Sequence, residues 1–140
     1  MRLLGLVLAF LLLTATPAGA GLLDLINAER VERDRPALIH NAALDRPARK
    51  HARWMMEHGI YHDTSALVRA LNEHAPTWTL AGENLGLGPS IRAVMDAWMD
   101  SPAHRRNLLR GRFSRVGLGV VRRDDERWVV LWLYDTREGA

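Results

Sequence analysis

Apolar residues recur at helical spacing along most of the chain, which predicts a series of amphipathic helices. Five stretches have this spacing and are bounded by capping residues, prolines or glycines: 22–34, 41–58, a segment that starts after Asp63 or Ser65, 91–99, and a short segment from Pro102 that ends before Gly111. In the second stretch Pro47 fits the first turn if Asp45 is the cap, and Gly59 ends the helix. Ser90 and Ser101 are the expected caps of the last two helices.

Two later segments, 116–121 and 128–134, have the composition of β-strands, and the polar residues 122–127 between them predict a hairpin connection. In the second strand both alternating sets of side chains are apolar, with Trp132 and Tyr134 in one set and Leu131 and Leu133 in the other. A strand that is apolar on both faces is normally covered on both. Helices are the only covers available, so the sequence predicts an α+β fold, a three-layer α-β-α sandwich around a small, mainly antiparallel sheet.

The N-terminal segment 1–20 is interpreted as a secretory signal peptide. Arg2 supplies the positive start, an apolar run follows, and Ala18, Gly19 and Ala20 have the small side chains of a cleavage site. The apolar run is shorter than the roughly 20 residues of a membrane span, and an uncleaved anchor is the alternative. We therefore expect one secreted domain over 21–140, extracellular or in the periplasm or cell envelope, with no stable membrane span after cleavage.

The composition excludes several kinds of chemistry. The 140 residues include no cysteine, which excludes disulfides, cysteine-ligated zinc and a thiol nucleophile. The net charge is +3 and the basic residues are scattered, so nucleic acid is not an expected partner. The one local basic cluster is interpreted as a solvated face in preference to a phosphate or anionic-lipid patch; it consists of Arg105, Arg106, Arg110, Arg112 and Arg115.

The segment 81–86, which reads Ala-Gly-Glu-Asn-Leu-Gly, is the most informative short stretch of the chain. Glu83 is flanked by apolar and small residues, so we expect its carboxylate on a partly buried surface. Gly82 and Gly86 allow either a tight turn or the close approach of a neighbour. Asn84 is expected to satisfy local backbone groups with its side chain. A carboxylate held rigidly in such a place indicates a site.

Three polar residues that are far apart in the sequence could meet at this site: His62, Glu83 and His104, each near a turn or a helix start. Two imidazoles and a carboxylate suit zinc or another divalent ion with positions left for water. The same groups suit general acid–base chemistry. They also suit a polar hydrogen-bond cluster that fixes the loops, which the pattern alone favours. His51, within the apolar stripe of 41–58, is interpreted as a hydrogen-bonded core histidine.

Four segments of the chain resemble a known family when they are taken in order. They are Tyr61-His62-Asp63-Thr64-Ser65, Ala81-Gly82-Glu83-Asn84-Leu85, Ala97-Trp98-Met99-Asp100-Ser101-Pro102-Ala103-His104-Arg105-Arg106-Asn107-Leu108-Leu109 and Val116-Gly117-Leu118-Gly119-Val120. This order is similar to that of the CAP superfamily, also called the SCP-like or cysteine-rich secretory, antigen 5 and pathogenesis-related domain. The resemblance extends over about 22–135 and is closest to the short bacterial branch without cysteines.

The resemblance implies an α-β-α sandwich and a central cleft with two histidines and two acidic residues, which binds a divalent metal in some members. His62, Glu83 and His104 match three of these positions, and Ser101 stands at the fourth, next to Asp100. A divalent metal such as zinc would then have three protein ligands and open positions. The implied site has His62, Glu83 and His104 as ligands and Asn84, Asp100 and Ser101 along the cleft.

Three functions stay open, because the family has no shared enzymatic mechanism and a fold alone does not give a function. The first is a non-enzymatic binding module for a divalent metal, a small molecule, a lipid or an envelope component. The second is a metal-assisted hydrolase that acts on peptides or cell-envelope polymers, with Glu83 as base or ligand. The third is a structural domain without a ligand. The first is preferred, because the chain has no complete catalytic motif.

Overall fold

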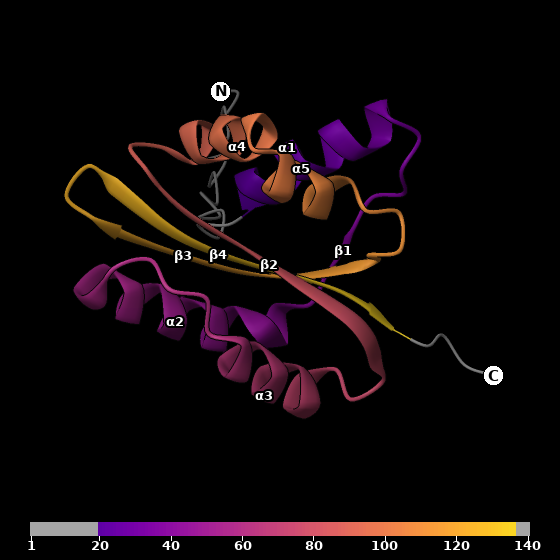
Figure 1. Cartoon of the computed structure of the whole chain (residues 1–140), viewed down its shortest axis with the longest axis horizontal. Helices are drawn as coiled ribbons and strands as arrows, with labels where there is room; N and C mark the ends of the chain where they lie inside the picture. Colours follow the sequence, from indigo (N-terminus) through magenta and orange to yellow (C-terminus); the bar gives the residue numbers. More distant parts are fainter. Residues whose placement is uncertain (1–19, 137–140) are drawn as a thin grey trace, which may run out of the picture.

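A computed structural model describes residues 20–136, in which helices and strands are mixed along the chain (Figure 1). In order, the elements are α1 (Ala20–Glu32), β1 (Ile39–His40), the 3₁₀ turn η1 (Ala42–Leu44), α2 (Asp45–His58), α3 (Thr64–His74), β2 (Trp78–Gly88), α4 (Ile91–Asp100), α5 (Pro102–Leu109), β3 (Arg115–Arg123) and β4 (Glu126–Thr136). The predicted signal peptide lies almost wholly outside the described residues and stays a prediction.

The four strands form one sheet in the order β1-β3-β4-β2, so that β2 lies at an edge. β4 pairs antiparallel with β2 and β3, whereas the short β1 pairs parallel with β3. Helices α1, α4 and α5 cover one face of the sheet, and α2 and α3 cover the other (Figure 1). The predicted three-layer sandwich with a mainly antiparallel sheet is confirmed.

Strand β4 separates two hydrophobic cores, as its doubly apolar pattern predicts. Leu131 and Leu133 pack with the buried side chains of α1 and α4, including Trp98. Trp132 and Tyr134 pack with α2 and α3 on the other face. The side chains of these four β4 residues are at most 1% exposed, which makes β4 the centre of the molecule.

The segment 81–86 lies in the middle of β2 and is extended, so it does not form a tight turn. Its glycines are instead points of close approach. A Cβ on Gly82 would lie 2.9 Å from the ring of Phe113, and a Cβ on Gly86 would collide with Val94. The α4–α5 layer therefore lies directly against β2 because these two positions carry no side chain.

Neighbouring side chains of β2 point into different layers, as the alternation of a strand requires. Glu83 and Leu85 contact the layer of α2 and α3, since Glu83 bonds to His62 and Leu85 belongs to the second core. Asn84, between them, bonds to the backbone of α5. One short stretch of β2 thus reaches both helical layers.

The expected caps are only partly confirmed. Asp63 and Ser90 accept hydrogen bonds from the first turns of α3 and α4. Asp45, however, is the first α-helical residue of α2, and its carboxylate accepts a bond from the Leu118 N–H of β3 at 3.1 Å. Ser101 occupies the N-cap position of α5 without making a side-chain capping bond. Two residues that the sequence assigns to helix capping therefore do not act as caps.

The connection between β3 and β4 is shorter than the predicted 122–127. The strands continue to Arg123 and Glu126, and Asp124 and Asp125 form the turn. Asp124 has a φ of 51°, as the tight turns that suit twisted hairpins require. Long antiparallel pairing of β3 with β4 extends both strands past the apolar residues that predicted them.

The buried side chain of Arg30 joins α1 to the segment that leads into β3. It is 0% exposed, and its guanidinium donates at 2.8–3.1 Å to four backbone carbonyls, those of Pro36, Leu108, Arg110 and Phe113. Burial lowers the pKa of Arg30, and the charge of Arg35 lowers it further. Because Leu108 lies at the C-terminal end of α5, the helix dipole also favours a cation there.

Candidate functional site at the edge of β2

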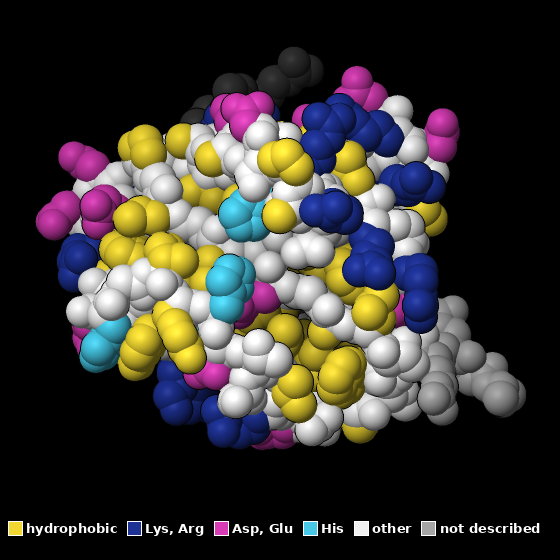
Figure 2. Space-filling model, viewed as in Figure 1, with side chains coloured by type: hydrophobic (Ala, Val, Ile, Leu, Met, Phe, Trp, Pro, Cys, Tyr) yellow, Lys and Arg dark blue, Asp and Glu magenta, His cyan; other side chains and the backbone are white. Residues whose placement is uncertain are grey.

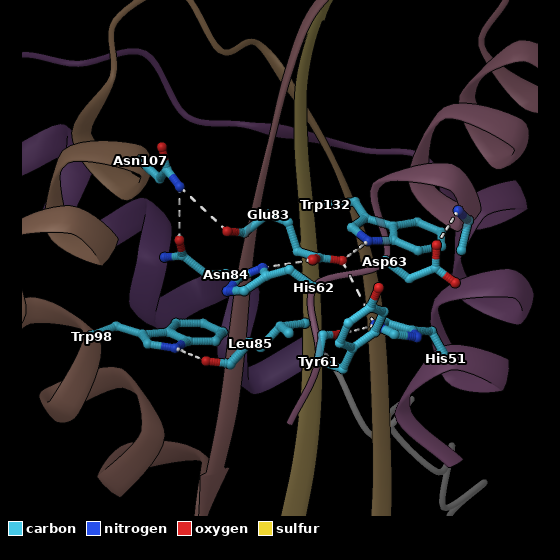
Figure 3. Close-up of polar contacts among 11 residues, drawn as sticks. His51, Tyr61, His62, Asp63, Glu83, Asn84, Leu85, Trp98, Asn107 and Trp132 are labelled. Carbon is cyan, nitrogen blue, oxygen red and sulfur yellow. Dashed lines mark hydrogen bonds and ion pairs between the residues drawn. The ribbon is translucent and has the colours of Figure 1, made fainter. Parts of the chain in front are cut away.

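The predicted site residues lie where the two helical layers meet over the edge of β2. His62 comes from the loop between α2 and α3, and His104 comes from the first turn of α5, in the opposite layer. Glu83 lies on β2, with its carboxylate next to His62 (Figure 3). Figure 2 shows histidine side chains gathered near the middle of this face, with an acidic side chain beside them and hydrophobic groups around them. The fold thus brings three distant segments to one surface.

The carboxylate of Glu83 is buried and held on both oxygens. Oε1 lies 2.8 Å from His62 Nδ1, and Oε2 accepts a 2.7 Å hydrogen bond from Trp132 Nε1. His51 Nε2 is 4.0 Å from Oε2. The Glu83 side chain is only 7% exposed, so its carboxylate is buried as expected, beside His62 and Trp132. Two short hydrogen bonds compensate the burial of this charge.

The bond to Glu83 sets the orientation of the His62 ring. Since a carboxylate only accepts, Nδ1 carries the proton and the neutral ring has its free acceptor at Nε2. The His62 side chain is 58% exposed, so the imidazole faces solvent while Glu83 stays beneath it. A carboxylate behind an imidazole also orients the histidines of many metal and acid–base sites.

His104 is positioned through its backbone by a pair of asparagines. Asn84 donates to the His104 carbonyl at 3.0 Å and accepts from Asn107 Nδ2 at 3.0 Å. The His104 ring lies beside the indole of Trp98. Burial lowers the pKa of His104, and the nearby His62 charge lowers it further, so the neutral imidazole is favoured.

The residues expected along the cleft have different roles. Asn84 is 0% exposed and makes the long-range bonds to α5, which corrects the expectations that it lines the cleft and that it serves local backbone groups. Ser101 borders a groove next to His104. Asp100 is exposed at the end of α4 and is not among the residues that line this groove.

The groove beside His104 has a volume of about 280 Å³ and runs between β2 and α4. Its lining is largely apolar: Val94, Ala97 and Trp98 are among the lining residues, and His104 lies at the border. It therefore combines an apolar surface with an imidazole, an arrangement typical of small-molecule sites.

Side chains of α4 and α5 also cover backbone carbonyls of β2. Trp98 Nε1 donates to the Leu85 carbonyl at 2.7 Å, and Asn107 Nδ2 lies 3.4 Å from the Glu83 carbonyl. Because β2 is an edge strand, these carbonyls have no strand partner on that side. The two bonds fix α4 and α5 to the strand that carries Glu83.

Two contributors to the site, Trp132 and Asn107, are not predicted from the sequence. Trp132 looks like one more apolar residue in a buried strand, and Asn107 like an ordinary polar residue of a short helix. Only the pairing of β2 with β4 and the packing of α5 on β2 place them there. His51, predicted as a hydrogen-bonded core histidine, is 6% exposed and bonds to the Tyr61 carbonyl, which confirms the prediction.

The residues do not assemble as a three-ligand metal site. Across residues 20–136, no group of three or more histidine, aspartate and glutamate side chains is placed to hold an ion. Glu83 lies behind His62 and bonds to its Nδ1, where it orients the ring. Zinc binding by His62, Glu83 and His104 therefore stays a prediction.

Comparison with known proteins agrees with this architecture. The profile of the family described as CAP, cysteine-rich secretory protein family, matches residues 23–133. A curated relative, the uncharacterized protein YkwD of Bacillus subtilis (strain 168), is 28% identical over 103 residues, which is 70% of this chain and 40% of the relative. The chain thus spans less than half the length of this relative.

Solved structures share the fold. An outer surface protein from Borrelia burgdorferi has a TM-score of 0.73 with 20% identity, covering 83% of this chain and 90% of that one. An extracellular SCP-domain protein from Bacillus anthracis has a TM-score of 0.72 with 25% identity, covering 83% and 39%. A cysteine-rich secretory protein from Staphylococcus aureus gives 0.69 with 22% identity, covering 83% and 38%. Within residues 20–136, the helices lack the length and apolar character that a membrane crossing requires.

Proposed function

The chain is a bacterial member of the CAP family of cysteine-rich secretory proteins, and from this premise we propose that it is a secreted, non-enzymatic binding module. Its ligand is a small amphiphile, such as a lipid or an envelope component. The apolar part occupies the groove between β2 and α4, and the polar group contacts His104 and His62. Two of the related structures are described as an outer surface protein and an extracellular protein, which supports the location.

The observation that carries this proposal is that both carboxylate oxygens of Glu83 already accept hydrogen bonds within the protein. Hydrogen bonds from His62 and Trp132 occupy one position on each carboxylate oxygen, and the side chain is 7% exposed. A general base must reach the proton that it removes, within about 2.6–3.2 Å of a substrate atom. Glu83 instead orients the exposed His62 ring, and the site offers imidazole nitrogens and apolar surface to a ligand.

The metal-dependent alternative has one observation in its favour. His62 exposes Nε2 and is held by a carboxylate at Nδ1, which is a common arrangement for a histidine that binds metal. With His104 nearby, the chain offers two nitrogen ligands for zinc. A metal-assisted hydrolase remains the second candidate, with peptides or cell-envelope polymers as substrates.

Two titrations on the mature domain test these functions. The first uses monomeric laurate as an amphiphilic probe and measures tryptophan fluorescence and heat. We expect saturable binding that is weakened about fivefold or more in His62→Ala and His104→Ala, because each variant removes a polar contact. His74→Ala, at the end of α3, is the matched control and should bind as the parent does.

The second titration uses zinc, calorimetrically, with the same three variants. Micromolar zinc binding that is lost in both site variants would favour the metal-dependent reading, and hydrolase assays with peptides would follow. Absence of laurate binding, or equal binding in all variants, would overturn the proposed amphiphile site.

A further inference from the structure

The chain between the end of α4 and the turn after β3 is strongly cationic. Residues 101–123 include seven arginines and neither aspartate nor glutamate. Five of these arginines are close together in the sequence, in α5, in the connection after it and at the start of β3; they are Arg105, Arg106, Arg110, Arg112 and Arg115. The sequence alone favours a solvated face for this cluster, and the fold shows what lies around it.

Few acidic groups of the fold balance these arginines. Arg112 lies 3.8 Å from Asp135 in a partly exposed pair, and Asp100 directly precedes the turn into α5. Arg105 and Arg106 are exposed on α5, and within residues 20–136 their side chains make no ion pair or hydrogen bond. An arginine surface with two such members favours an anionic partner.

Arg35, from the connection between α1 and β1, adds a further cation to this surface. Its guanidinium lies 3.7 Å from the position that a Cβ on Gly111 would take. Burial first, and the charge of Arg35 second, lower the pKa of Arg30 nearby. Like charges are therefore held close together here, an arrangement that an external anion would stabilise.

The arginine surface adjoins the candidate site. Arg105 directly follows His104, which borders the groove between β2 and α4. Exposed apolar side chains border the site as well: Leu87 lines the same groove and is 44% exposed, and Tyr61, next to His62, is 58% exposed. Figure 2 shows Lys and Arg side chains to the right of the central histidines and hydrophobic side chains to their left, on one face of the molecule.

The apolar part of this face is larger than these two side chains. Ile60 is 50% exposed, and Trp54, whose ring centroid lies 5.7 Å from that of Tyr61, is 42% exposed. Across the described residues, four of the six large hydrophobic side chains that are exposed belong to this face. Tryptophan and tyrosine are the residues enriched at membrane–water interfaces. The face thus has both parts of a membrane-surface site, cations and interfacial apolar groups.

We propose that this face, which carries Arg105 and Arg106 together with Tyr61 and Leu87, docks on a bilayer that contains anionic phospholipid. The guanidinium groups contact the phosphates of the lipids, and the exposed apolar side chains enter the interface. A soluble polyanion would use the arginines alone and leave the apolar side chains in water. The docking does not depend on the proposed amphiphile site, because it needs no ligand in the groove.

Vesicle co-sedimentation of the mature domain is the test. The probes are vesicles of phosphatidylcholine with an equal amount of phosphatidylglycerol, and vesicles of phosphatidylcholine alone. We expect saturable binding to the anionic vesicles and binding to the neutral vesicles that is weaker by about tenfold or more. Raising the NaCl concentration from about 50 to 500 mM should weaken the binding to anionic vesicles to a similar extent, because salt screens the charges.

Paired variants separate the α5 arginines from the net charge of the protein. Arg105→Gln with Arg106→Gln should weaken binding to anionic vesicles about 20-fold, since each cation near such a surface contributes about fivefold. The matched control is Arg46→Gln with Arg53→Gln, which removes two exposed arginines of α2 in the opposite layer and should leave binding unchanged. All four side chains are exposed, so both proteins should fold, and melting curves check this.

A second pair of substitutions tests the apolar contact. Tyr61→Ser with Leu87→Ser should weaken binding about tenfold, because these side chains then no longer enter the bilayer. Ile39→Ser is the control, since Ile39 is 52% exposed on β1 at the opposite edge of the sheet from β2. Brominated lipid chains should quench the tryptophan fluorescence of the parent protein, and quench it less in Trp54→Phe, which lacks the exposed indole.

The proposal is overturned if the domain does not bind anionic vesicles at about 1 mM lipid. It is also overturned if the α5 and α2 pairs of variants bind equally. If Tyr61→Ser with Leu87→Ser binds as the parent does and soluble polyphosphate displaces the vesicles, the partner is a soluble polyanion and the bilayer proposal is wrong. Laurate binding is measured without vesicles, so the amphiphile site and the docking surface succeed or fail separately.

Discussion

Trp132 and Glu83 are direct partners across the paired strands β4 and β2, and the indole N–H of Trp132 donates to the carboxylate at 2.7 Å. The pairing of the strands therefore fixes the position of Glu83 along β2, and the indole N–H fixes the orientation of its carboxylate. Both groups are largely buried, with the Glu83 side chain 7% exposed and Trp132 0% exposed. This hydrogen bond joins the core residue Trp132 to the site residue Glu83.

Replacing Trp132 with phenylalanine should destabilise the domain by about 1–3 kcal/mol, because a buried carboxylate oxygen loses its donor. Urea unfolding followed by circular dichroism measures the change. Trp128→Phe on the same strand is the matched control, since Trp128 donates at 3.2 Å to the exposed Glu126. An equal loss in the two variants would show that lost ring volume, and not the bond to Glu83, causes the effect.

Asn84 and Asn107 should behave as one unit. Asn84→Ala is expected to cost about 1–3 kcal/mol, because it removes the buried donor to the His104 carbonyl and one of the two acceptors of Asn107 Nδ2. The double variant with Asn107→Ala should lose less than the sum of the single changes, by about 0.5 kcal/mol or more. Chemical denaturation of all four proteins tests this, with Asn72→Ala, which loses an exposed bond to Trp78, as control. Strict additivity would contradict the coupling.

The stability of the domain should depend on pH through His104. Burial first, and the His62 charge second, lower the pKa of His104 in the folded state. The unfolded chain, with an ordinary value of about 6.5, then binds more protons as the pH falls. The free energy of unfolding contributed by this group is fully present above about pH 7 and decreases as the pH falls through the unfolded value and towards the folded one.

His104→Gln should flatten this part of the pH profile between about pH 7 and 5, while His74→Gln should leave it unchanged. The measurement is urea unfolding at closely spaced pH values. A steeper decrease in His104→Gln than in the parent protein would show that the sign of the shift is wrong.

Arg30 should be far less tolerant of substitution than its neighbour Arg33. Arg30→Lys cannot supply donors to four carbonyls from one planar group, and we expect a loss of about 3–5 kcal/mol. Arg33→Lys changes a half-buried pair with Glu29 on one helix and should cost at most about 1 kcal/mol. Thermal unfolding of both variants compares them, and similar melting temperatures would contradict a structural role for the buried guanidinium.

The sequence predicts those parts of the fold that depend on local pattern. The helical stripes, the caps Asp63 and Ser90, and the doubly apolar strand around Trp132 all lead to the observed layers. The burial of Glu83 agrees with the expectation from its small and apolar neighbours, although it is His62 and Trp132 that contact its carboxylate. These features need no knowledge of distant contacts.

The rest depends on contacts between distant segments. The stretch 81–86 has no β-branched or aromatic residue, and it forms a strand because it pairs with β4 and packs under Phe113 and Val94. The partners of Asn84 lie 20 or more residues away, so its role in holding α5 cannot be derived from its neighbours. For the same reason the pattern of His62, Glu83 and His104 gives no indication that Glu83 orients His62.

The bonds of Trp98 and Asn107 to the carbonyls of β2 also bear on aggregation. An uncovered edge strand is a template on which the strand of another molecule can add. Here the side chains of Trp98 and Asn107, from the helical layer on one face of the sheet, donate to the carbonyls of Leu85 and Glu83 in the middle of β2. Trp98 and Asn107, which attach α4 and α5 to the strand that carries Glu83, thus also protect the sheet from intermolecular pairing.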